Sequence, residues 1–152
     1  MPLAEVPLGI TAPERTFAVP ERFAPVGVTF GGVIELAGVE LPDRAWGPGE
    51  PVEVGLAWQA RSAIDVSYRV FLHLLDADGN LVDQSDGEPA AWTRPTTGWA
   101  QGEVVTESRQ VRLPADAAGD YVLRVGFYAP GEARLLTDEG EDGYVLASIH
   151  VD

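Results

Sequence analysis

The fold of this chain is decided by residues 66–86, whose sequence is VSYRVFLHLLDADGNLVDQSD. Apolar side chains recur at every second position from Val66 to Leu74, and the polar residues Ser67, Arg69 and His73 fall between them. This alternation is typical of a β-strand with one buried face. The DADGN turn that follows supplies Asp, Gly and Asn, the residues that connect the strands of hairpins. The segment therefore predicts an antiparallel hairpin.

Alternating apolar runs extend over most of the remaining chain. They are found at residues 28–41, 52–59, 102–113, 121–128 and 144–151. Turn residues separate the runs about every 8 to 12 residues, and no segment keeps the 3.6-residue period of a helix. We therefore predict an all-β fold, an immunoglobulin-like antiparallel β-sandwich of about 7 to 9 strands.

Two of these runs are irregular in ways that predict local structure. Up to Leu36 the alternating apolar residues occupy even-numbered positions, and from Val39 on they occupy odd-numbered ones. This shift at Ala37-Gly38 indicates a β-bulge. In the run 102–113, Glu107 and Arg109 fall on the same face of the predicted strand as its apolar residues. Only an edge strand or a strongly twisted strand tolerates such a pattern, so we expect one of the two here.

The N-terminal segment differs in composition from the rest of the chain. Residues 1–27 hold five of the twelve prolines, and proline disfavours both helices and central strands. We predict an extended, proline-rich leader or connector over residues 1–27, anchored by Phe17 and Phe23, and a β-sandwich domain over residues 28–152. The first ten residues hold no basic residue and do not resemble a secretory signal.

The overall composition narrows the classes of function. With 152 residues the chain fits one domain, and without cysteine it has no disulfides and no thiolate metal ligands. It carries 24 acidic and 10 basic residues, and its net charge is −14. Such a charge favours solubility and opposes binding to nucleic acid or to an anionic membrane surface. No apolar run approaches the roughly 18 residues that span a bilayer, so we expect no direct membrane insertion by this segment.

No motif of the chain defines an active site. Residues 76–80 begin with the oxygen spacing of a calcium loop but lack the rest of the pattern, so they are interpreted as a turn capped by its own side chains. The acidic turn 138–143 is interpreted as solvated. His73 and His150 stand alone, and no nucleophile elbow, P-loop or dinucleotide fingerprint is present. We expect no catalytic residues, no metal and no cofactor, and therefore no enzyme.

Tryptophans are the side chains best suited to ligand contact, because an exposed indole stacks on the face of a sugar ring. Trp58 falls on the apolar face of its predicted strand and is expected to pack in the interior, whereas Trp46 lies in a loop. Trp92, Arg94 and Trp99 share one long, proline-bearing loop and form the best candidate ligand-binding patch, of a carbohydrate-binding type. The alternative is that these residues pin the loop to the sandwich, with Trp99 as the pin.

A series of strand and turn phrases appears in one order along the chain. They are VTFGGVIELAGVEL at 28–41, LAWQA at 56–60, VFLHLLD at 70–76, PTTGW at 95–99, GEV at 102–104, GDY at 119–121 and VGFY at 125–128. This order resembles the β-sandwich modules at the C-terminal end of large bacterial multi-pass membrane proteins, many of them glycosyltransferases of the protein-mannosyltransferase type. The PLGI segment at 7–10 is similar to the connector that precedes such modules.

The resemblance implies architecture and context, since its phrases are strand and turn patterns without active-site residues. It implies a non-catalytic accessory or interaction module, extracytoplasmic and tethered to the membrane through a parent chain, which binds a glycan or a neighbouring protein. Two alternatives stay open. One is a free-standing carbohydrate-binding module that uses the loop tryptophans, and the other is a glycoside hydrolase that uses two carboxylates.

Overall fold

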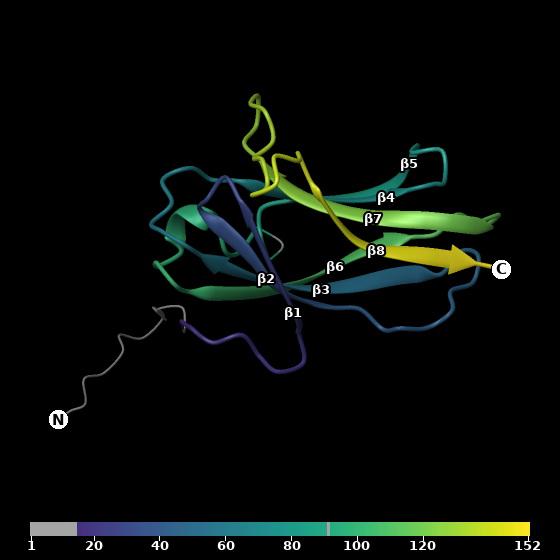
Figure 1. Ribbon diagram of the computed structural model, residues 1–152, viewed down its shortest axis with the longest axis horizontal. Helices are drawn as coiled ribbons and strands as arrows, with labels where there is room; N and C mark the ends of the chain where they lie inside the picture. The colour runs from purple at the N-terminus through teal and green to yellow at the C-terminus, as the bar shows by residue number, and fades with distance from the viewer. Residues whose placement is uncertain (1–14, 91) are drawn as a thin grey trace.

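The structure is a computed structural model that describes residues 15–90 and 92–152. Within them, eight strands form two antiparallel sheets packed face to face (Figure 1), and no helix is long and apolar enough to cross a membrane. The predicted all-β sandwich is confirmed. The strands are β1 (Ala24–Phe30), β2 (Ile34–Glu40), β3 (Pro51–Ala60), β4 (Arg69–Leu75), β5 (Leu81–Gly87), β6 (Val104–Arg112), β7 (Gly119–Tyr128) and β8 (Tyr144–Val151), with one 3-10 turn, η1 (Thr96–Gly98).

The strand order is that of an immunoglobulin-like domain with one addition. One sheet has the order β1-β2-β3-β6 and the other β5-β4-β7-β8. The set β2-β3-β6 reproduces the A-B-E order of such domains, and β5-β4-β7-β8 reproduces C′-C-F-G. β1 is an additional strand beside β2. The open edges are therefore β1 and β6 in one sheet, and β5 and β8 in the other.

The hairpin that predicts the fold forms β4 and β5 and supplies the centre of the core. Val70, Leu72 and Leu74 of β4 have no exposed surface, and complete burial of such a side chain stabilises the fold by about 1.5–3 kcal/mol. Trp58 of β3 is buried as predicted and meets Phe127 of β7 edge to face, with ring centroids 4.6 Å apart. The two inner sheet faces thus interdigitate at aromatic side chains.

Phe71 departs from the predicted alternation, because it lies on the outer face of β4 and is nevertheless buried. The segment after β7 folds back over it, and the Arg134 guanidinium lies 4.2 Å from its ring centroid. Gly126, opposite Phe71 on β7, leaves room for the ring, since a Cβ atom there would lie 2.5 Å from it. Residues 129–143 form the yellow-green loop that rises from this face in Figure 1.

The two irregular runs have the structures that their patterns predict. The register of β2 on β3 shifts between Leu36 and Gly38. Gly38 is required there, because a Cβ atom at this position would lie 2.7 Å from the Cβ of Phe23. β6 is an edge strand, and the side chains of Glu107 and Arg109 turn inward and are almost fully buried.

The leader contacts the sandwich along β6. Thr16 forms an isolated antiparallel bridge with Val104, and Phe23 is buried on the outer face of the sheet. Phe17, the other expected anchor, is 55% exposed. β1 begins at Ala24, inside the segment predicted as leader. The part of the predicted leader that spans residues 1–14 lies outside the described residues.

Candidate functional site

The predicted ligand patch lies in the loop between β5 and β6, and the structure separates its three residues. Trp99 is 4% exposed and belongs to the core, and its indole N–H donates to the carbonyl of Arg94 at 3.0 Å. Arg94 turns its guanidinium toward Glu103, at 2.5 Å. Trp92 is 53% exposed. Of the three, Trp92 alone presents its ring to solvent, whereas Arg94 and Trp99 hold the loop to the sandwich.

Glu103 organises this loop. Its buried carboxylate accepts hydrogen bonds from the guanidinium groups of Arg94 and Arg15 and, at 2.9 Å, from the N–H of Ala100. Burial raises the pKa of Glu103, but the hydrogen bonds from Ala100 and the two arginines outweigh it and hold the pKa below its ordinary value. Arg15 also donates to the carbonyl of Gly98 at 3.0 Å. The carboxylate therefore ties the leader and the loop to the start of β6.

Glu103→Gln is expected to lower the free energy of unfolding by about 2 kcal/mol at neutral pH, because both arginines lose a charged acceptor but stay partly solvated. The folded-state pKa of Glu103 lies below the ordinary value of 4.5. The wild type therefore loses this stabilisation as the pH falls below that value and through the folded-state pKa. Urea unfolding at about pH 7 and about pH 3 measures the difference, with Glu21→Gln as an exposed control. A difference that persists undiminished at the lower pH would contradict the assignment.

Trp92 is held in an unusual backbone conformation at the edge of β5. Its φ of +72° is rare for a bulky residue and costs roughly 1–3 kcal/mol. The Trp92 N–H donates to the carbonyl of Glu88 at 3.2 Å. The indole packs on Gly87, where a Cβ atom would lie 3.0 Å from Nε1, and the Arg69 guanidinium lies 4.9 Å from the ring centroid. The indole is thus fixed in place while part of it stays open.

Beside Trp92, the outer face of the sheet β5-β4-β7-β8 carries a cavity of about 320 Å³. We call this cavity the outer-face hollow. The sheet register brings its residues together, because His73 of β4 pairs with Gln84 of β5, and Phe71 pairs with Asp86. The hollow is lined by Phe71, His73, Gln84, Asp86, Tyr128 at the end of β7, and Glu132 and Arg134 of the loop that follows.

The outer-face hollow neighbours the surroundings of Trp92. Arg69, whose guanidinium lies over the Trp92 ring, pairs with Tyr128 in the register of β4 on β7. Asp86 lines the hollow and also a second cavity, of about 230 Å³, whose wall includes Trp92. An exposed indole, a tyrosine and a polar hollow therefore lie next to one another, and we call them together the proposed surface.

The hollow offers polar groups that are not used within the protein. Among residues 15–90 and 92–152, the side chains of Gln84, Tyr128 and Glu132 form no hydrogen bond or ion pair. His73 Nε2 lies 3.6 Å from Asp86 Oδ1. Burial lowers the pKa of His73, and Asp86 only partly opposes this, so His73 is neutral at pH 7. A neutral imidazole presents one donor and one acceptor, which adds to the hydrogen-bonding capacity of the surface.

A larger cavity, a groove of about 790 Å³, lies on the opposite sheet and fits a ligand less well. Its aromatic residues, Phe23 and Trp46, are buried. The Arg44 guanidinium covers the Trp46 ring at 3.8 Å and also pairs with Glu50 at 3.0 Å. Among the described residues that line it, this groove therefore has no exposed aromatic ring.

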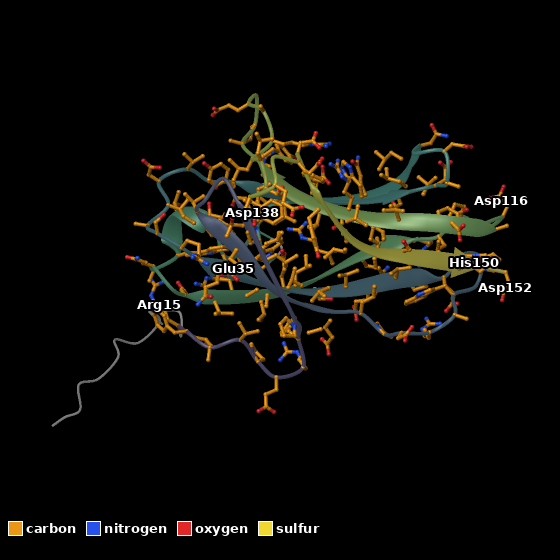
Figure 2. The ribbon with its side chains drawn as sticks, in the orientation of Figure 1. Arg15, Glu35, Asp116, Asp138, His150 and Asp152 are labelled. Atoms are coloured by element: carbon orange, nitrogen blue, oxygen red, sulfur yellow. The ribbon has the colours of Figure 1, made fainter. Side chains whose placement is uncertain are left out.

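The remaining polar clusters have structural roles. Asp76 Oδ1 accepts the N–H groups of Asp78 at 3.0 Å and Asn80 at 2.9 Å, which is the capped turn that the sequence predicts. His150 lies 2.8 Å from Asp120 in an exposed pair at the C-terminal end of β8. Figure 2 shows His150 at the end of the sandwich opposite Arg15. No three acidic or histidine side chains within the described ranges are placed to hold a metal ion.

Comparison with known proteins gives the fold alone. No protein-family model matches the chain, and no curated protein matches it. Among solved structures, the chain is similar to the C-terminal domain of Wzt, with a TM-score of 0.56 and 14% sequence identity, over 86% of this chain and 81% of that chain. At this identity the likeness supports the β-rich architecture and identifies no ligand.

Proposed function

We propose that this chain is a non-catalytic accessory module that binds a glycan at the outer-face hollow and Trp92. The observation that carries the proposal is that the exposed indole of Trp92 adjoins a hollow in which Gln84, Tyr128 and Glu132 have no side-chain partner among the described residues. Aromatic faces stack on the apolar faces of sugar rings, and side-chain amides, hydroxyls and carboxylates bond to the sugar hydroxyls. A cavity of about 320 Å³ is at the lower end of the range for small-ligand sites.

The resemblance of the strand phrases supports a context for this binding. In that context the module faces outward from the membrane, as the accessory domain of a glycosyltransferase-like parent chain. Detection of the native protein in membrane fractions, as part of a chain longer than 152 residues, would support the parent-chain proposal. A native protein that is soluble and no longer than this chain would instead favour the free-standing carbohydrate-binding module, which would use the same surface.

Trp92→Ala and Tyr128→Ala are each expected to weaken glycan binding at least about tenfold, which corresponds to a loss of about 1.4 kcal/mol. Both rings belong to the proposed surface, and neither is part of the main core cluster. The measurement is a glycan array followed by calorimetric titration of the oligosaccharide that gives the strongest signal. Phe17→Ala is the matched control, because Phe17 is an equally exposed aromatic residue outside the hollow.

Three results would count against the proposal. Binding that survives both substitutions would place the glycan elsewhere, and the absence of any glycan signal would remove the proposed function. Release of reducing sugar from the bound oligosaccharide would replace the non-catalytic role with the glycoside hydrolase alternative, in which two carboxylates flank the scissile bond.

A further inference from the structure

The outer-face hollow carries more negative than positive charge. Asp86 and Glu132 line it, and neither is paired with an arginine in the part of the chain that the structure describes. Arg134 is the one arginine among the described lining residues. Its guanidinium lies over the Phe71 ring at 4.2 Å and is 3.4 Å from Asp142. The positive charge is therefore already engaged, while neither carboxylate is neutralised by an arginine in the described chain.

The charges around Arg134 do not reverse this balance. Asp142 also binds Arg124, at 2.6 Å, and this hydrogen bond lowers the pKa of Asp142, which is ionised at neutral pH. Arg124 and Arg134 contribute +2, and Asp142, Asp86 and Glu132 contribute −3, which leaves −1 with His73 neutral. The net charge of −14 over the whole chain has the same sign and repels anionic ligands at longer range.

One more arginine lies near the surface, at its Trp92 end. The Arg69 guanidinium is placed over the Trp92 ring at 4.9 Å, and Arg69 does not line the hollow. Its charge lies at the Trp92 end and offsets the charge of the wider surface, whereas the residues that line the hollow, Asp86, Glu132 and Arg134, keep a net charge of −1. The surface is polarised, with its cationic group at the aromatic end and its carboxylates in the hollow.

We infer that the outer-face hollow takes the donor-rich ring of a neutral or amino-bearing sugar and excludes a ring that carries a carboxylate or a phosphate. Ionised carboxylates only accept hydrogen bonds, and they bind hydroxyl and ammonium donors strongly. An acidic ring would place a further negative charge next to Asp86 and Glu132, and like charges brought together are the usual means of rejecting a wrong ligand. This inference rests on the proposed function and adds the class of ligand.

A glycan array that holds neutral, amino-bearing and acidic oligosaccharides tests the inference at neutral pH. Neutral or amino-bearing glycans are expected to give the strongest signals. Titration with β-1,4-linked oligomers of glucose, glucosamine and glucuronic acid then compares matched rings, and the glucuronic acid oligomer is expected to bind at least about tenfold more weakly than the best of the three. Preferred binding of acidic glycans would overturn the inference and leave the proposed function standing. Absence of binding to every glycan would remove both.

The double variant Asp86→Asn/Glu132→Gln tests whether these two carboxylates cause the weaker binding of acidic glycans. The amides keep the shape of the side chains but remove both charges. The affinity for acidic oligosaccharides is therefore expected to rise at least about tenfold relative to the affinity for neutral ones. Glu21→Gln/Asp116→Asn removes the same total charge from exposed positions outside the hollow and is the matched control. An equal recovery in both double variants would assign the effect to the net charge of the chain and would overturn the inference about the hollow.

Discussion

Arg109→Met is expected to lower the free energy of unfolding by about 3–5 kcal/mol. Arg109 Nε lies 3.0 Å from Glu107 Oε1, and both side chains are almost fully buried between the open edges of the two sheets. Removal of one partner from a buried ion pair leaves an uncompensated charge, and the cost is about 3–5 kcal/mol. Methionine replaces most of the lost volume with a flexible apolar chain, so the effect reports the charge rather than a cavity.

Glu107 has further partners that make this prediction testable in a double variant. Its carboxylate accepts the indole N–H of Trp58 at 2.6 Å and the N–H of Ala90 at 3.0 Å. A glutamine removes the charge but keeps one acceptor oxygen, and Trp58 and Ala90 donate to different oxygens of Glu107, so one of the two hydrogen bonds is lost. Glu107→Gln/Arg109→Met is therefore expected to recover about half of the loss. Arg112→Met, at an exposed position of the same strand, is the control and should cost less than about 1 kcal/mol. Chemical denaturation gives all three values, and a loss below about 1 kcal/mol for Arg109→Met would refute the buried pair.

The same pair connects the edge of the sandwich to the proposed site. Arg109 donates to the carbonyls of Ser85 at 3.1 Å and Gly87 at 3.0 Å, so a β6 side chain holds the backbone of β5. β5 carries Gln84 and Asp86 into the outer-face hollow. Inward-pointing charges are also one of the devices that protect open sheet edges from pairing with other chains. The pair therefore fixes the strand that the ligand surface needs and protects that edge at the same time.

Much of the fold can be predicted from the sequence because its signals are local. The alternation of Val70, Leu72 and Leu74 specifies which face of β4 is buried. The shift of the apolar positions before Gly38 corresponds to a β-bulge in the structure. The two charged residues on the inward face of the run 102–113, Glu107 and Arg109, belong to an edge strand. Each of these patterns lies within one strand. They depend on the two-residue period of the backbone and not on which strands become neighbours.

The site is harder to predict because it depends on contacts between distant segments. Trp92 and Trp99 lie in the same loop, but one is exposed and the other belongs to the core. The hollow needs Tyr128 of β7 beside the pairs that β4 forms with β5, an arrangement that no local pattern encodes. Burial of Phe71 likewise depends on Arg134, which arrives from the loop after β7. The signal that was available is the row of polar residues at outward positions of β4 and β5, which sequence alone cannot distinguish from an ordinary solvated face.

Trp99→Ala is expected to lower the free energy of unfolding by about 3–5 kcal/mol, the range for removing a buried aromatic side chain. Trp99 packs in the main core cluster, and its indole N–H holds the carbonyl of Arg94. Trp92→Ala is expected to change the same free energy by less than about 1 kcal/mol, since about half of the Trp92 side chain is exposed already. Thermal and urea unfolding of both variants measure the contrast.

The contrast between the two tryptophans also decides which of them can face a ligand. A ring whose loss destabilises the fold has its surface occupied by protein, whereas a ring whose loss does not is free to stack on a sugar. Trp92→Ala should therefore weaken glycan binding in a protein of near wild-type stability. If the two substitutions destabilise the chain equally, Trp92 is packed as firmly as Trp99, and the outer-face hollow lacks the aromatic face on which the glycan proposal depends.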